Sequence, residues 1–121
     1  MIQYNRSLIM AFAHLWKKAH NISLSEALQI SWASAKCLKL QELMENYVVT
    51  FEYTKKSDGS KRLATGTRSK EIVSYEKLTE RKANDEVFVY FDLEANGLRS
   101  FVRRNIGKIK SFKPIEKLIR A

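Results

Sequence analysis

Two stretches near the start of the chain place apolar residues at the spacing of an amphipathic helix. In residues 7–19 these positions are Leu8, Phe12, Leu15, Trp16 and Ala19, three or four residues apart, so they share one helical face. Ser23 and Glu26 have the spacing of a capping box, which starts a second helix. One face of this helix carries Leu24, Leu28, Trp32 and Ala35, with Ala27, Ser31 and Leu38 beside it. The pattern predicts a helical hairpin, and Leu40, Leu43 and Met44 either extend its second helix or cap the structure that follows.

After position 46 the apolar period changes to that of a strand. Tyr47–Thr54 alternates apolar and polar positions and is rich in aromatic and β-branched residues, so it predicts a strand. Residues 55–60 contain the turn dipeptide Asp58-Gly59, after which Lys61–Thr67 returns as a second strand. Gly66 inside that strand indicates a bulge or a sharp bend, as small barrels need at their corners.

Residues 86–106 predict a second hairpin, which is the part of the chain around which the rest is organised. Val87, Val89, Phe91 and Leu93 point to one side, and Phe88, Tyr90 and Asp92 point to the other. Residues 95–97 (Ala-Asn-Gly) tolerate positive φ, so the chain reverses there and returns over residues 98–103. Asp92 is then expected to pair with Arg99 across the two strands.

The remaining segments are shorter. Residues 69–85 are polar and predict an irregular loop with a short strand at residues 72–75. Residues 105–107 predict a 3₁₀ turn, residues 108–112 a closing strand, and Pro114 its end. We therefore expect one domain, made of a helical hairpin (residues 1–46), a small β-barrel (residues 47–113) and a basic tail (residues 114–121).

Charge is what sets this composition apart. The chain has 121 residues, with 22 Lys and Arg against 13 Asp and Glu, a formal net charge of +9. This excess favours nucleic acid or another polyanion as a partner. Cys37 is the single cysteine, which excludes an internal disulfide and fits a reducing compartment, and its apolar helical surroundings predict a packed thiol. The longest apolar run, residues 8–13, is far short of the ~20 residues that span a membrane. We expect a cytoplasmic protein with no membrane partner.

The positive charge is concentrated in two segments. Residues 55–70 hold six basic side chains and one acidic, and residues 99–121 hold eight and one. If the two hairpins are neighbours in one sheet, their cations converge into one basic surface for phosphates. The candidate nucleic-acid-binding residues are Lys61, Arg62, Arg68, Arg99, Arg103 and Arg104. Exposed Tyr53, Tyr90 or Phe101 would stack on bases between them. The alternative is that these cations solvate the barrel and protect its edges.

Candidate catalytic and metal-binding groups are sparse. His14 and His20 are six residues apart, share no helical face and have no further ligand at metal-site spacing. Asp92 and Glu94 are better explained by cross-strand pairing than by acid–base catalysis, and no phosphate-binding loop is present. We therefore predict a non-enzymatic protein with no metal and no cofactor. The rival hypothesis is a protein-interaction module, or a homodimer, that docks through the Trp16 and Trp32 helices or through an open strand edge.

Several short motifs of the predicted barrel resemble those of a known family. They are Asp58-Gly59-Ser60, Arg62, Gly66-Thr67-Arg68, Tyr90-Phe91-Asp92-Leu93, Arg99-Ser100-Phe101 and Asn105-Ile106. Over residues 48–109 the chain is similar to small proteins with an SH3-like β-barrel fold from gut-dwelling bacteria, their phages and their mobile elements. The Arg-x-Phe ending also resembles WYL-type domains, small barrels of bacterial regulators that bind nucleic acid or nucleotides. The resemblance implies an α+β fold in which the helical hairpin precedes a five-stranded, partly open, antiparallel SH3-like β-barrel.

Overall fold

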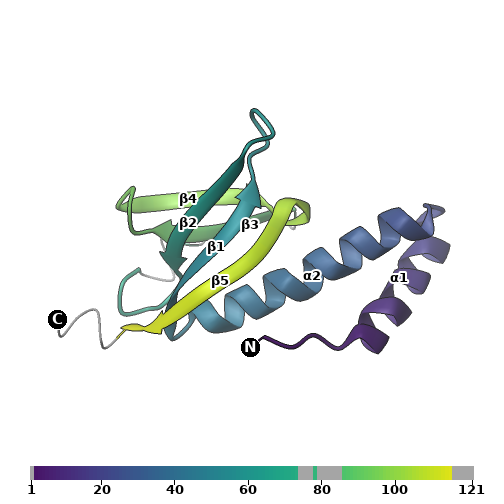
Figure 1. Ribbon diagram of the computed structural model, residues 1–121, viewed down its shortest axis with the longest axis horizontal. Helices are drawn as coiled ribbons and strands as arrows, with labels where there is room; N and C mark the ends of the chain where they lie inside the picture. The colour runs from purple at the N-terminus through teal and green to yellow at the C-terminus, as the bar shows by residue number, and fades with distance from the viewer. Residues whose placement is uncertain (1, 74–77, 79–85, 116–121) are drawn as a thin grey trace.

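The computed structural model describes residues 2–73, 78 and 86–115, and shows two helices followed by a sheet (Figure 1). The elements are α1 (Arg6–His20), α2 (Leu24–Met44), β1 (Tyr47–Thr54), β2 (Lys61–Thr67), β3 (Val87–Asp92), β4 (Gly97–Val102), the 3₁₀ turn η1 (Arg103–Asn105) and β5 (Ile106–Pro114). The predicted α+β class is confirmed. Within the described residues, no helix is both long and apolar enough to cross a membrane.

Both helices begin at a residue whose side chain caps the first turn. The Asn5 side chain accepts the Leu8 amide at 3.1 Å and the Ser23 hydroxyl accepts the Glu26 amide at 3.1 Å, so each first turn is capped. Asn21 ends α1 in the left-handed conformation, with φ of 52°. Helix α2 continues to Met44, which confirms that Leu40, Leu43 and Met44 extend it.

The five strands form one antiparallel sheet in the order β4-β3-β2-β1-β5. Strands β4 and β5 are its two edges and are not paired with each other, so the barrel is open, as predicted. The register between β1 and β2 runs without a shift up to Gly66, its last pair, so of the two predicted alternatives at Gly66 the bulge is wrong. The register shifts lie instead between β1 and β5, on either side of Phe51.

Two of the shorter predicted segments need correction. The 3₁₀ turn lies at Arg103–Asn105, two residues earlier than expected, because β5 already begins at Ile106, and the predicted end of this strand at Pro114 is confirmed. Ile72 and Val73 lie in a turn, not in the predicted short strand, and the other two residues of that strand, 74 and 75, lie outside the described residues. Of the predicted basic tail, residues 116–121 also lie outside them.

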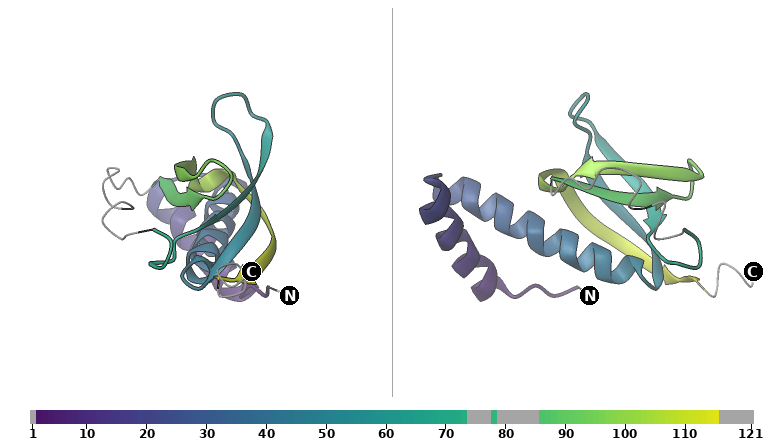
Figure 2. Two further views of the ribbon diagram at one scale, coloured as in Figure 1. Left: turned by 90° about the vertical axis from the view of Figure 1, so that its left-hand side faces the viewer. Right: turned by 180° about the vertical axis from the view of Figure 1, so that it is seen from behind.

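Helix α2 faces two partners along its length. Its N-terminal half buries Ala27 and Ser31 against α1, and the Ser31 hydroxyl donates to the Ile9 carbonyl at 2.7 Å. Its C-terminal half lies along the sheet and buries Ala33, Cys37, Leu40 and Met44 in the core (Figures 1 and 2). From the sheet, the core takes Val49, Phe51, Tyr53, Ala64, Phe88, Tyr90, Phe101 and Ile106. Because α2 packs first against α1 and then against the sheet, different faces of the helix are buried along its length. The predicted face, with Leu28 and Trp32, is therefore only half-buried.

Cys37 is packed, as predicted. Its side chain is buried and its Sγ lies 3.6 Å from the Arg103 carbonyl oxygen, at the contact of α2 with η1. Burial raises the pKa of the Cys37 thiol from its ordinary value of 9.0 to about 11. The thiol therefore stays protonated at neutral pH, which makes it a poor nucleophile.

This pKa predicts a pH dependence of stability. The folded state disfavours the thiolate, so the stabilisation is complete below pH 9 and is lost as the pH rises from about 9 to about 11. We expect Cys37 to cost about 1.4 kcal/mol of unfolding free energy per pH unit in that window. Urea unfolding of the wild type and of Cys37→Ala at several pH values measures this contribution. The other titrating groups are present in both proteins, so their effects cancel in the difference between the two unfolding free energies. If the difference in unfolding free energy between the wild type and Cys37→Ala did not narrow above pH 9, the raised pKa of Cys37 would be contradicted.

Candidate anion-binding site

The candidate site is built by cross-strand neighbours at one end of the sheet. Tyr53 of β1 is paired with Arg62 of β2, and Tyr90 of β3 is paired with Arg99 of β4. Directly paired residues lie on the same face of a sheet, and Asp92, two residues after Tyr90, shares that face too. The register alone therefore brings two arginines, two tyrosines and one carboxylate together.

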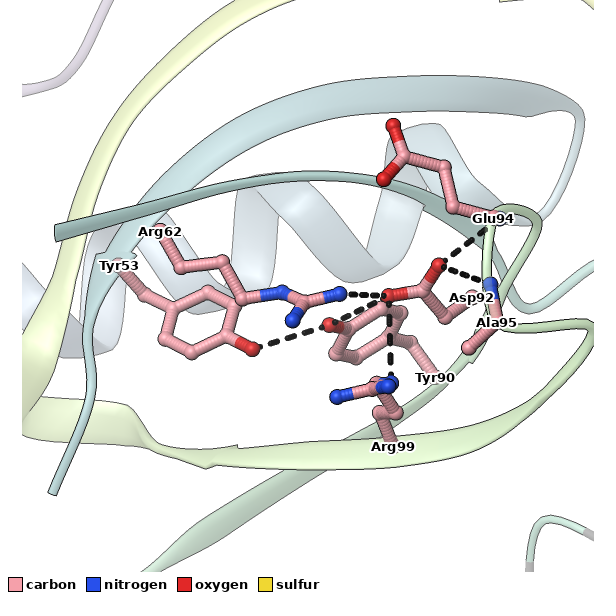
Figure 3. A network of polar contacts seen from close by, with 7 residues as sticks. All are labelled: Tyr53, Arg62, Tyr90, Asp92, Glu94, Ala95 and Arg99. Carbon is pink, nitrogen blue, oxygen red and sulfur yellow. Dashed lines mark hydrogen bonds and ion pairs between the residues drawn. The ribbon is translucent and has the colours of Figure 1, made fainter. Parts of the chain in front are cut away.

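The Asp92 carboxylate is the centre of this group and is fully buried (Figure 3). Its Oδ2 accepts from Arg62 Nη2 at 3.0 Å and lies 3.7 Å from Arg99 Nε. Its Oδ1 accepts the backbone N–H groups of Glu94 at 2.9 Å and Ala95 at 3.1 Å, in the turn after β3. The predicted pair of Asp92 with Arg99 is confirmed, and Arg62 is the closer partner that the sequence pattern did not reveal.

The two tyrosines complete the network. Tyr90 donates its hydroxyl proton to Asp92 Oδ2 at 3.4 Å, so Tyr53, 3.3 Å away, must be the donor to the Tyr90 oxygen. Burial and the bond with Tyr53 raise the pKa of Tyr90 well above its ordinary value, so it is a proton donor at any physiological pH. The network thus hydrogen-bonds the Arg62 head group to the carboxylate and places the more exposed Arg99 head group beside the same oxygen.

A cationic hollow lies beside this network. It has a volume of about 510 Å³ and lies between the end of the β1–β2 hairpin and strand β4. Its charged lining residues are Lys55, Lys56, Arg62 and Arg99, and among the described residues no acidic side chain lines it. Thr54, Ser57 and Ser100 also line it, and each carries a hydroxyl group that is a potential hydrogen-bond donor. Four cations around one hollow, with one carboxylate beneath two of them, make this an electropositive site.

Two of the predicted binding residues meet at a different place, on the ring of Phe88. The guanidinium carbons of Arg68 and Arg103 each lie 5.3 Å from the centre of this ring. Arg68 donates to the Val89 carbonyl at 2.9 Å and Arg103 donates to the Val87 carbonyl at 3.2 Å. Strand β2 pairs with β3 only at Gly66 and Thr67. The two arginines therefore donate hydrogen bonds to carbonyls of β3 that lie outside this pairing. Arg68 and Arg103 have a structural role here.

The other two predicted cations lie apart from both groups. Arg104 is 3.6 Å from the Glu26 carboxylate at the start of α2, and Lys61 is exposed at the start of β2 without lining the hollow. The six predicted residues therefore fall into separate groups, of which Arg62 and Arg99 line the hollow. Lys55 and Lys56 line it too and were missed, although their place beside the Asp58-Gly59 turn in a basic segment was a usable indication.

The expected base-stacking residues are not available. Tyr53, Tyr90 and Phe101 are each at most 6% exposed and pack together in the core, where the Tyr53 and Phe101 rings are stacked at 4.9 Å. The prediction of exposed aromatics is wrong, because these rings face α2 and fill the inside of the sheet. The site therefore offers charge and hydroxyl groups to a ligand, with ring edges at most.

Both histidines, His14 and His20, are exposed on α1. His20 stacks on Trp16 with ring centres 4.3 Å apart, on the outside of α1. Within residues 2–73, 78 and 86–115, no group of three His, Cys, Asp or Glu side chains is placed to hold a metal ion.

Comparison with known proteins identifies the sheet and its supporting helix. A protein-family model named WYL_2, described as an Sm-like SH3 β-barrel fold, matches residues 37–106, more than half of the chain. The match begins in the core half of α2 and ends at the start of β5, so it includes every residue of the Asp92 network and the cations of the hollow. No curated protein and no solved structure matches the chain.

Proposed function

We propose that this chain, which belongs to the WYL_2 family with its Sm-like SH3 β-barrel fold, is a non-enzymatic accessory protein that binds nucleic acid through the cationic hollow. Lys55, Lys56, Arg62 and Arg99 contact the phosphates in this proposal. The single observation that supports it is the gathering of four cations around one hollow, with no carboxylate among the described residues that line it. A net charge of +9 adds long-range attraction for a polyanion.

The Asp92 network gives the hollow its geometry. Arg62 and Arg99 are long side chains that would otherwise lose rotamer freedom when they bind a phosphate. Their contacts with Asp92 at 3.0 and 3.7 Å hold them in place beforehand, so less entropy is lost on binding. Asp92 is a positioning residue in this proposal and does not contact the ligand.

The chemistry of the lining determines what is recognised. Lysine, arginine and hydroxyl groups contact phosphate oxygens, which are the same at every nucleotide. The aromatic rings that would stack on bases are buried. We therefore propose backbone recognition with little sequence preference, whose affinity falls steeply with salt because bound phosphates release counterions.

The test uses a double variant, Lys55→Ala with Lys56→Ala. These lysines contribute to the hollow but not to the core, so the fold is expected to be unchanged. We expect binding of labelled single- and double-stranded oligonucleotides to weaken about 10-fold or more at low salt, and the slope of log affinity against log salt to fall by about two. Fluorescence anisotropy at several salt concentrations measures both quantities.

The matched control removes the same charge elsewhere. Lys108 and Lys113 lie exposed on β5 and do not line the hollow. Lys108→Ala with Lys113→Ala is expected to lower affinity much less than the Lys55 and Lys56 variant. Equal losses in the two variants would show that only net charge matters, and undetectable binding of the wild type at low salt would refute the proposal.

A further inference from the structure

Helix α1 exposes an apolar stripe that is not used to pack against α2. The helix packs on α2, and its buried residues are Ile9 and Ala13. Leu8, Phe12, Leu15 and Trp16 instead leave 53%, 49%, 63% and 39% of their surface exposed. A contiguous apolar face of this kind on a small protein marks an interaction surface. We name these four residues, with Ala19, the α1 stripe.

The α1 stripe has the spacing of a helix–helix seam. Leu8, Phe12, Leu15 and Ala19 follow one another at intervals of four, three and four residues, which are alternating d and a positions of a heptad repeat. Trp16 flanks this seam. Of the three cations of α1, Lys18 lies beside the seam, and Arg6 and Lys17 lie farther around the helix. Such a narrow, uncharged seam fits the seam of another helix.

We propose that the α1 stripe binds the α1 stripe of a second copy of this chain. An apolar heptad seam is complementary to itself about a two-fold axis, so a homodimer needs no other recognition element. Covering the stripe and its immediate neighbours on both copies would bury on the order of 1,000 Å², the lower limit of a specific interface. The product is a four-helix arrangement of two α1–α2 hairpins.

The shape of the molecule permits this pairing. The α1–α2 end of the hairpin extends away from the sheet, and α1 lies at the far end from strands β2 and β4 (Figures 1 and 2). The cationic hollow is at the sheet end, lined from the β1–β2 hairpin and β4. The dimer leaves both hollows open, and this proposal stands independently of what they bind.

Salt separates this interaction from binding of a polyanion. Each copy carries a net charge of +9, so the two copies repel, and salt screens that repulsion. The dimer is therefore expected to become tighter as salt rises, whereas nucleic-acid binding weakens. Failure of one proposal is thus distinguishable from failure of the other.

The test is sedimentation equilibrium of the full chain over a broad range of concentration, with Leu15→Lys as the variant. Leu15 is exposed, so its replacement leaves the core intact, and the introduced cation faces its own copy across the seam. We expect the wild type to dimerise and the variant to dimerise at least about 10-fold more weakly. Leu8→Lys is a second variant of the same seam. The control is Met10→Lys, which adds the same charge at an exposed site on another face of α1.

Each outcome bears on the proposal. A concentration-dependent dimer that Leu15→Lys or Leu8→Lys weakens, while circular dichroism of the variant is unchanged and Met10→Lys has little effect, supports it. A wild type that is monomeric at all concentrations and salts overturns it. A dimer that all three variants weaken equally, or that none weakens, places the interface elsewhere and also overturns it. Binding of the monomer to vesicles of anionic lipid, lost in Leu15→Lys, would assign the stripe to a membrane surface instead.

Discussion

Replacing Asp92 by asparagine is expected to lower the free energy of unfolding by about 3 kcal/mol, which is the cost of removing one partner from a buried ion pair. The asparagine side chain would keep an oxygen for the Glu94 and Ala95 amides, so the turn after β3 survives. It would leave Arg62 without its charged partner, while Arg62 Nε already lacks a hydrogen bond in a buried position within the described part of the chain. The amide nitrogen of the new side chain would also be a donor at the place where Oδ2 accepts from Arg62 and Tyr90. The loss would therefore come from the missing charge and the missing acceptor, while the shape of the side chain is unchanged.

Chemical denaturation of Asp92→Asn and of a matched control measures this loss. Glu94 lies two residues away in the same turn and is exposed, so Glu94→Gln makes the same change of charge without disturbing a buried group. We expect the control to stay within about 0.5 kcal/mol of the wild type. If the two variants were equally stable, Asp92 would not be the electrostatic centre of the site.

A second consequence for nucleic-acid binding follows from the same substitution. Asp92→Asn raises the net charge, so a site that depends on charge alone would bind more tightly. A site that depends on fixed Arg62 and Arg99 side chains would gain less than that, or would lose affinity. Glu94→Gln adds the same charge, so comparing the nucleic-acid affinities of the two variants distinguishes a site that depends on net charge from one that depends on fixed arginines.

Replacing Gly66 by alanine is expected to destabilise the protein by about 2 to 3 kcal/mol through overpacking. A Cβ at this position would lie 2.7 Å from the Phe91 carbonyl oxygen and would overlap the Tyr90 ring. The carbonyl belongs to the backbone of β3, where that strand pairs with β2, so it cannot move aside without opening the ladder. Alanine also lowers the conformational entropy of the unfolded chain, but this stabilising effect is smaller than the cost of overpacking.

Gly97→Ala is the matched control for this prediction. The nearest atom to a Cβ at Gly97 is the Ala95 carbonyl oxygen at 3.9 Å, an ordinary contact, and Gly97 does not have positive φ. We expect its stability to be unchanged or slightly increased. Thermal unfolding of both variants gives the comparison. A Gly66→Ala protein as stable as Gly97→Ala would mean that the approach of β2 to Tyr90 is looser than the structure indicates.

Gly66 also shows a difference between what the local sequence pattern indicates and what tertiary packing explains. The sequence correctly marks it as unusual for a strand, and a bulge is one common reason. The actual reason is the approach of Tyr90, which belongs to a different hairpin, and no local pattern contains that information. The same applies to Arg62 and Asp92, which meet across 30 positions.

The helices and the main strands of this protein can be recognised from its sequence. Apolar spacing changes from the period of a helix to that of a strand at Tyr47, Ser23 caps α2, and Asn96 allows the turn between β3 and β4. These features depend on neighbours a few residues apart, so they can be recognised in the chain, together with the pairing of Asp92 and Arg99 across a short hairpin.

Which faces are buried and which cations meet depends on how the elements pack together. Tyrosine and arginine have an apolar body and a polar end, so either side of a strand suits them until something packs against it. The core half of α2 packs against the sheet, which buries Tyr53, Tyr90 and Phe101 and leaves Arg62 and Arg99 with Asp92. The same packing leaves the α1 stripe exposed, because α2 supplies the core and α1 buries little against it.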